Sequence, residues 1–304
     1  MMDKRVFERL KKNVALWLFE DVKDSVTRQL FHDDPLAFFS SLDPINDKSA
    51  IALIGLNLEH LSHWHLVQYE NAGINLGLAE YSHLGLATKY AKKVLDVNAA
   101  LINRGLEKKI DCGVLLTEAA LTLSLSIISG WVGDARSVFA TLVTGLDSSL
   151  LDLRKNTRHQ KGVLYRHFWF LLHLCSDIFS VNVATDNYSY PDDMSPYDEV
   201  LEQWRTDDPA LVKRLVSSMA DFHLAHSRST GHGDILEFDV EKRALFPYEI
   251  LAFLRIREWA GLRNPDSYDH PLMNTALAHM SADAVPYPVS DFSEKIMEIL
   301  TKKQ

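Results

Sequence analysis

Apolar residues recur at spacings of three and four along most of this chain. In the first segment this spacing is kept, with charged residues in between, by Val6, Leu10, Val14, Trp17, Leu18 and Val22. Such spacing places the apolar side chains on one face of an α-helix. Alternation of apolar and polar residues, which is typical of a strand, is best over residues 235–240 and is weak even there. The pattern therefore predicts an all-α fold.

Helix starts are marked by a capping side chain followed by proline, at Asp34-Pro35, Ser195-Pro196 and Asp208-Pro209. The capping side chain accepts a hydrogen bond from a free N–H of the first turn, and proline loses no hydrogen bond there. Together with the apolar spacing, these signals predict about ten to twelve helices. Their expected ranges are 4–30, 35–41, 48–69, 73–103, 110–130, 134–153, 162–182, 196–205, 209–226, 247–261, 270–280 and 289–302.

Small residues are frequent between Ala72 and Ala91, where the chain is expected to be helical. Because glycine weakens a helix, several small residues in one helix indicate close contact with neighbouring helices or a break, here near Ser82–Gly85. No repeat period returns along the chain, so an irregular multi-helix array is expected and not a regular solenoid.

Polar segments divide the chain. Residues 154–162 are basic and lack apolar side chains, and residues 183–196 are acidic and rich in turn-forming residues. This favours two helical halves packed together, 1–158 and 159–304, the second of which holds an acidic loop over 183–208.

The composition narrows the class of protein. With 304 residues, 47% of them hydrophobic and 24% charged, the chain can build a large core. A net charge of −9 argues against nucleic acid or an anionic membrane as the main partner, because both attract a basic surface. The apolar stretch 114–132 contains Glu118 and several hydroxyl side chains, which favours a buried core helix over a membrane span.

The two cysteines, Cys112 and Cys175, lie far apart in apolar stretches and form no CxxC motif. They are expected to be buried, reduced thiols, as is usual in cytoplasmic proteins. The N-terminal segment has only a short apolar run, Val14 to Phe19, with acidic residues directly after it, so no signal peptide is expected. The predicted localisation is therefore cytoplasmic.

The most unusual stretch is 186–208, which holds eight carboxylates and a single base, Arg205. Large aromatic residues are interleaved with the acids. A concentrated negative charge attracts a cationic partner, and aromatic side chains supply contact area that can anchor it. The residues predicted to contact a basic protein partner are Tyr188, Tyr190, Asp192, Asp193, Tyr197, Asp198, Glu199 and Glu202. The alternative interpretation is a polar loop in which Asp208 caps a helix and Trp204 lies in the core.

A second cluster consists of Glu59, His60 and His63 in one segment and Glu80 and His83 in the next. Helical di-metal sites need several Glu-x-x-His pairs on facing helices, and only Glu80-x-x-His83 has that spacing. Polar residues packed between helices are the favoured interpretation, and no cofactor is expected. The chain also lacks a nucleophile elbow, a P-loop and a GxGxxG motif, so it is not expected to be an enzyme.

Three stretches carry a resemblance to a known class of proteins. They are 116–145 with its Gly133-Asp134-Ala135-Arg136 turn, 190–194 (YPDDM), and 246–272 with Phe246-Pro247-Tyr248, Arg255, Arg257, Gly261-Leu262 and His270-Pro271-Leu272. Together they resemble the all-helical immunity proteins of bacterial polymorphic-toxin and type VI secretion systems. The resemblance implies a non-catalytic cytoplasmic antitoxin that binds its cognate toxin, for example a basic nuclease toxin. The alternatives are a metal-dependent helical enzyme that uses the Glu59 to His83 cluster, and a helical scaffold or regulator.

Overall fold

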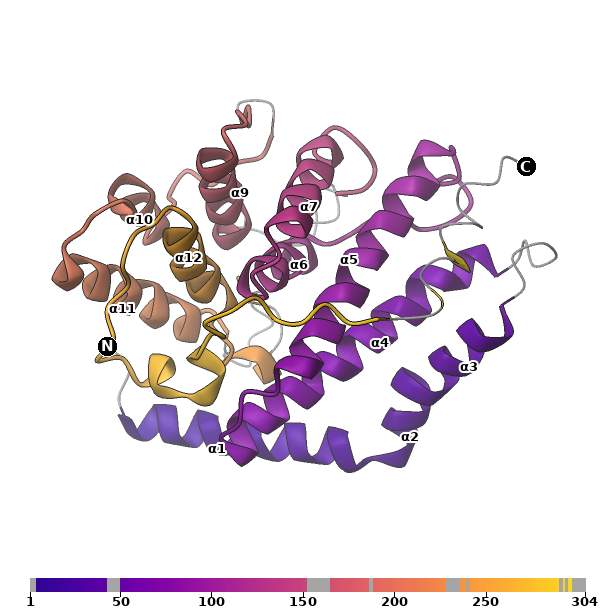
Figure 1. The fold of residues 1–304 in the computed structure, drawn as a ribbon, viewed down its shortest axis with the longest axis horizontal. Helices are drawn as coiled ribbons and strands as arrows, with labels where there is room; N and C mark the ends of the chain where they lie inside the picture. The colour runs from indigo at the N-terminus through magenta and orange to yellow at the C-terminus, as the bar shows by residue number, and fades with distance from the viewer. Residues whose placement is uncertain are drawn as a thin grey trace.

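The computed structural model describes residues 4–42, 50–151, 165–185, 188–227, 236–238, 241–289, 292 and 295–296. The regular elements in these ranges are helices (Figure 1). The α-helices are α1 (Lys4–Lys23), α2 (Ser25–Arg28), α3 (Asp34–Ser41), α4 (Ile51–Asn71), α5 (Tyr81–Asn103), α6 (Leu116–Ile128), α7 (Val132–Gly145), α9 (Arg166–Phe179), α10 (Tyr197–Gln203), α11 (Pro209–Ala225) and α12 (Tyr248–Trp259). Two π-helical turns, η1 (Gln29–Asp33) and η2 (Ala72–Leu76), and three 3-10 turns, η3 (Glu241–Arg243), η4 (Pro271–Asn274) and η5 (Ala276–Ala278), complete the set.

The all-α class is confirmed. Within the described ranges, β-pairing is limited to one isolated bridge between Val114 and Leu151. Residues 236–238, the described part of the best strand candidate, are not in a strand. None of the helices in the described ranges has both the length and the apolar composition that crossing a membrane requires.

Two of the expected long helices are interrupted. The first is divided at Asp24, whose carboxylate accepts hydrogen bonds from the N–H groups of Val26 (3.3 Å) and Thr27 (3.0 Å) and so caps a new helix. The second, expected over 73–103, is divided before Tyr81, because Gly77 adopts φ +68°, a left-handed conformation that favours glycine. The break lies a few residues before the expected position at Ser82–Gly85.

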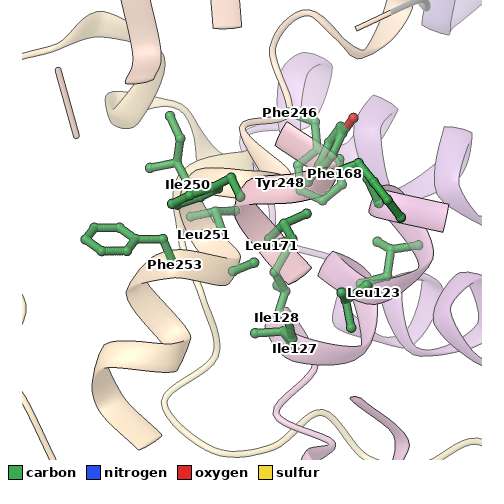
Figure 2. Close-up of a cluster of buried hydrophobic side chains, with 14 of the residues drawn as sticks. Leu123, Ile127, Ile128, Phe168, Leu171, Phe246, Tyr248, Ile250, Leu251 and Phe253 are labelled. Carbon is green, nitrogen blue, oxygen red and sulfur yellow. The ribbon is translucent and has the colours of Figure 1, made fainter. Parts of the chain in front are cut away.

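A hairpin formed by α4 and α5 runs through the middle of the molecule, and α1 packs against α4 (Figure 1). Helix α6 contacts α5, α7, α9 and α12, and most of its side chains are buried. Figure 2 shows the centre of this packing, where Leu123 and Ile127 of α6 face Leu171 of α9 and Leu251 of α12. The stretch 114–132 is therefore dominated by a core helix, as its hydroxyl residues and Glu118 indicated.

The main hydrophobic core draws side chains from both sides of residue 158. A smaller core joins α3, α4 and α5 around Phe39, Leu58 and Val97. Residue 158 itself lies outside the described residues. Both cysteines are buried and free, as their apolar surroundings indicated.

The segment 270–280 was expected to be one helix and instead forms the two short turns η4 and η5. His270 Nδ1 accepts a hydrogen bond from the N–H of Leu272, and the Thr275 hydroxyl donates to the Leu272 carbonyl at 3.1 Å, so local side chains compete with a continuing helix. The expected helix 289–302 lies mostly outside the described residues.

After η5 the chain crosses α5 and the turn between α6 and α7 in an extended form (Figure 1). Val285 N–H donates to the Ser129 carbonyl at 2.9 Å, and Trp131 Nε1 donates to the Val285 carbonyl at 2.7 Å. This close approach needs a glycine at position 130, where φ is +76° and a Cβ would lie 3.0 Å from Ala284 Cα. The C-terminal segment is thereby hydrogen-bonded to the turn between α6 and α7.

Candidate functional site

The acidic segment predicted to bind a partner forms the chain between α9 and α11 and includes α10. Asp198 and Glu199 lie in the first turn of α10, where the helix dipole favours negative charge. Asp208 accepts a hydrogen bond from the N–H of Ala210 at 2.9 Å and caps α11 at Pro209. The capping role expected for Asp208 is therefore confirmed.

Most carboxylates of this segment lie at the surface. We call the set the α10 acidic surface; its exposed or half-exposed members are Asp192, Asp193, Asp198, Glu199, Glu202, Asp207 and Asp208. Three arginines surround it, and two of them pair with members: Arg166 with Asp193 at 3.3 Å and Arg214 with Glu199 at 2.7 Å. The third, Arg205, lies 3.6 Å from Asp177 instead.

Four members of the α10 acidic surface, Asp192, Asp198, Glu202 and Asp207, form no ion pair within the part of the chain that the structure describes. Like charges held close together repel one another, and surface arginines offset this only in part. The surface therefore keeps an uncompensated negative charge that a cationic partner would neutralise.

Two of the predicted aromatic contacts, Tyr188 and Tyr190, are half-buried. The Tyr188 hydroxyl donates to Asp147 Oδ1 at 2.6 Å, and this hydrogen bond raises the Tyr188 pKa to about 12. The Tyr190 hydroxyl lies 3.0 Å from His173 Nε2, and its ring lies against Trp169. Both rings are thus fixed at one edge and leave part of their surface available to a partner.

The prediction that Tyr197 is the third aromatic contact with a partner is wrong. Its side chain is fully buried and stacks on Phe170 with ring centroids 4.5 Å apart, so it belongs to the core and cannot reach a partner in this structure. Trp204 is also buried, and its Nε1 donates to Asp177 Oδ2 at 2.9 Å. Here the alternative interpretation, a core role for Trp204, is the one the structure supports.

The C-terminal end of α10 is held from below by Arg257 of α12. This fully buried guanidinium donates to the backbone carbonyls of Trp204, Thr206 and Arg263 and to Asn264 Oδ1. Three backbone carbonyls that lie beyond regular helix hydrogen bonding are satisfied by a single side chain. Arg257 thereby positions the turn after α10, between Glu202 and Asp207 of the α10 acidic surface.

Below the N-terminal end of α10 lies a buried polar network that the sequence did not reveal. His223 Nδ1 lies 2.9 and 3.1 Å from the two carboxylate oxygens of Glu249. His167 Nδ1 lies 3.0 Å from Glu237 Oε1, and its Nε2 lies 3.3 Å from the Tyr248 hydroxyl. The charges of Glu249 and Glu237 add to burial in raising the Tyr197 pKa well above its usual range. The network thus lies directly beneath the first residue of α10.

The histidine and glutamate cluster considered as a metal site is divided by the structure. His60 and His63 lie against Phe31, with ring centroids 4.7 and 5.0 Å away, whereas His83 Nδ1 lies 2.9 Å from His65 Nδ1. Glu80 precedes α5, and its carbonyl accepts from His83 N–H. Within the described ranges, no three histidine, cysteine, aspartate or glutamate side chains converge as metal ligands. These residues therefore do not form the site that the alternative function needs.

The substitution His65→Gln is expected to make folding stability less sensitive to acid. Burial lowers the pKa of His65 to about 3, and the charges of His83 and His32 add to the effect. In the unfolded chain the pKa of a histidine is about 6.5. As the pH falls through this window, the unfolded state takes up a proton that the folded state does not, so stability is lost. When the pH is lowered from about 7 to about 4, the free energy of unfolding measured with urea should fall on the order of 2 kcal/mol further for the wild type than for the variant.

The matched control for this measurement is His279→Gln, because His279 is exposed. It should keep the pH dependence of the wild type. An acid sensitivity that is the same in His65→Gln as in the wild type would show that His65 is not the titrating group.

Glu59 and His63 instead line a cavity of about 290 Å³ between α4, α5, α6 and η3. Its other polar side chains are Ser62 of the same helix and, from distant segments, Asn98, Glu118, Thr122 and Arg243. A neighbouring cavity of about 160 Å³ shares Glu118 and Arg243 with it and reaches Tyr248. The sequence pointed to one wall of this cavity only.

The surroundings of the larger cavity shift the pKa values of titratable side chains that line it. Burial raises the pKa of Glu59 and of Glu118, and the charge of Glu59 raises that of Glu118 further. Burial lowers the pKa of His63 to about 4, and Arg243 contributes to this. His63 is therefore neutral near pH 7, while the ionised form of each glutamate is less favourable here than in water.

Comparison of the whole chain with protein-family models, with curated proteins and with solved structures gave no significant match. The immunity-protein resemblance therefore stays a prediction. The feature that bears on it is the α10 acidic surface.

Proposed function

We propose that this chain is an immunity protein that binds a basic toxin domain in the cytoplasm through the α10 acidic surface. The observation that supports the proposal best is the group of unpaired exposed carboxylates Asp192, Asp198, Glu202 and Asp207. A protein that neutralises a toxin by contact needs a complementary surface and no catalytic group of its own.

The support beneath this surface favours a pre-formed binding site. Tyr197, Trp204 and Arg257 are buried below α10 and its following turn, so the carboxylates project from a backbone that packing holds in place. A surface that is ordered before binding avoids the entropy cost of ordering it in the complex. Tyr188 and Tyr190 flank the acids and provide the apolar contact area.

The triple substitution Asp192→Lys, Asp198→Lys and Glu202→Lys is expected to weaken toxin binding by about tenfold to a hundredfold, because it reverses the charge that attracts the partner. The partner to test is a basic toxin domain, taken from a neighbouring gene where one encodes a secreted toxin. Binding is measured by interferometry at two salt concentrations, and protection is measured as growth of cells that express the toxin together with each variant. The affinity of the wild type should also fall as salt rises.

A control triple variant reverses acids elsewhere on the surface, Glu20→Lys, Asp283→Lys and Asp266→Lys, and should bind and protect like the wild type. Wild-type binding by the α10 variant, with its fold intact by circular dichroism, would place the interface elsewhere. Absence of any binding by the wild type would reject the immunity function for this toxin.

A further inference from the structure

We propose that the cavity between α4, α5, α6 and η3 binds a small organic cation, namely an amine with an apolar body whose ammonium group lies between Glu59 and Glu118. This site is separate from the α10 acidic surface and does not depend on the proposed function. The assignment follows from the cavity's polar side chains, its apolar wall and its charge.

The cavity contains buried polar groups that have no partner. Asn98 and Thr122 are 9% and 8% exposed, both line the cavity, and neither side chain forms a hydrogen bond within the described part of the chain. A buried amide or hydroxyl without a partner costs free energy. Their presence here indicates a cavity that holds polar atoms of a ligand or of water.

The remaining wall is apolar. Leucine and valine side chains of three helices and of the 113–114 segment surround the polar groups: Leu66, Val94, Leu95, Val114 and Leu121. A volume of about 290 Å³ is at the lower end of the range for small-molecule sites, roughly 300–1,000 Å³. The ligand is therefore of metabolite size and has an apolar part in contact with these side chains.

The charges favour a cation. Arg243 Nε lies 3.6 Å from Oε1 of the buried Glu70, whose pKa burial raises to about 7, so Glu70 offsets part of the positive charge of the cavity. Glu59 and Glu118 line the cavity with side chains that are only partly exposed to solvent, and within the described residues neither forms an ion pair. Two carboxylates whose ionised forms are disfavoured by their surroundings gain most from a positive charge placed between them.

An amine fits better than a metal ion or an anion. The other polar groups of the cavity are an amide, hydroxyls, a neutral imidazole and the Arg243 guanidinium that faces Glu70, and no three metal-ligating side chains converge within the described ranges. An anion would be repelled by the two glutamates. An ammonium group donates three hydrogen bonds, which carboxylates on either side of it can accept.

The test is calorimetric titration of the full chain at neutral pH with matched probes. 2-Phenylethylamine and n-hexylamine carry the ammonium group on an apolar body. 2-Phenylethanol has the same body without charge, phenylacetate has the opposite charge, and phenylalanine is a zwitterion. At least one amine should bind at least about tenfold more tightly than its uncharged or anionic counterpart, and binding should weaken as the pH falls and the glutamates take up protons.

The variants Glu59→Gln and Glu118→Gln remove charge at nearly constant shape. Glutamine at position 118 can still accept the hydrogen bond from Leu115 N–H, which Glu118 Oε2 now accepts at 3.2 Å, so the start of α6 is kept. The double variant should lose the tenfold preference for the amine. Ala91→Phe, which places a ring in the cavity, should lower the affinity for amine and alcohol alike.

The matched control is Asp192→Asn with Asp198→Asn, which should leave amine binding unchanged. Failure of both amines to bind more tightly than phenylethanol, or an amine affinity that survives in the folded Glu59→Gln/Glu118→Gln variant, would overturn the proposal. Tighter binding of phenylalanine than of phenylethylamine would also overturn it, since Arg243 would then be binding a carboxylate. None of these outcomes bears on toxin binding, which is measured separately.

Discussion

Replacing Arg257 by methionine is expected to lower the free energy of unfolding by about 3–5 kcal/mol. The side chain is fully buried and satisfies the carbonyls of Trp204, Thr206 and Arg263. Methionine has a similar length and can fill the space, but it donates no hydrogen bond. The Trp204 carbonyl would stay buried without a partner, and the part-buried carbonyls of Thr206 and Arg263 would lose theirs. Each unsatisfied buried group costs roughly 1–3 kcal/mol, and relaxation of the turn recovers part of that.

The measurement is urea denaturation of Arg257→Met beside Arg263→Met. Arg263 is a neighbouring exposed arginine whose side chain forms no hydrogen bond or ion pair within the described residues, so its loss should change stability by less than about 0.5 kcal/mol. Hydrogen exchange should also show faster opening of residues 200–208 in Arg257→Met than in the wild type. A loss of stability no larger than that of Arg263→Met would mean that these carbonyls find other partners.

The Arg257→Met variant and the charge-reversed Asp192/Asp198/Glu202 variant together separate effects on folding from effects on binding. Arg257 lies beneath the α10 acidic surface, where its charge interacts with Asp207. If the surface binds a toxin, Arg257→Met should weaken binding only to the extent that α10 and its turn become disordered. Charge reversal of Asp192, Asp198 and Glu202 should weaken binding while leaving stability nearly unchanged, because these side chains are exposed.

The sequence predicted the fold class because helical periodicity is a local property of the chain. It also predicted Asp208 as a cap, since the capping residue and the following proline are adjacent. The break at Asp24 had a comparable signal, a carboxylate followed by Ser25, but the apolar spacing continues across it and concealed it. Apolar spacing also missed the two turns that replace the helix expected over 270–280, because it does not register that the His270 and Thr275 side chains hydrogen-bond to the nearby backbone.

The candidate sites could be predicted less well than the fold, because contacts between distant segments decide which side chains they contain. Tyr190 and Tyr197 lie in one acidic, aromatic segment, yet one is half-exposed and the other is buried against Phe170. Nothing in the spacing of the segment distinguishes the two, because the deciding contact comes from another helix. The cavity draws Glu59 from α4 and Glu118 from α6, and only a folded structure brings them together.

The substitution Glu249→Met is expected to destabilise the protein by about 3–5 kcal/mol, because it leaves His223 buried without its partner. Both side chains have no exposed surface, and His223 Nε2 already lacks a hydrogen bond within the described residues. In the double variant His223→Leu/Glu249→Met both polar groups are gone and apolar side chains of similar size replace them. It should be at least about 2 kcal/mol more stable than Glu249→Met alone.

A double-mutant cycle by urea denaturation, with His223→Leu as the fourth member, measures this coupling. Additive losses of stability would mean that the pair contributes no interaction and that the two positions matter only through packing. The double variant is informative about function as well. If the His223–Glu249 pair only supports Tyr197 and α10, a folded double variant should bind the toxin like the wild type. If it folds and binding is lost, the buried pair fixes the conformation of the α10 acidic surface, which an apolar replacement with the same volume cannot do.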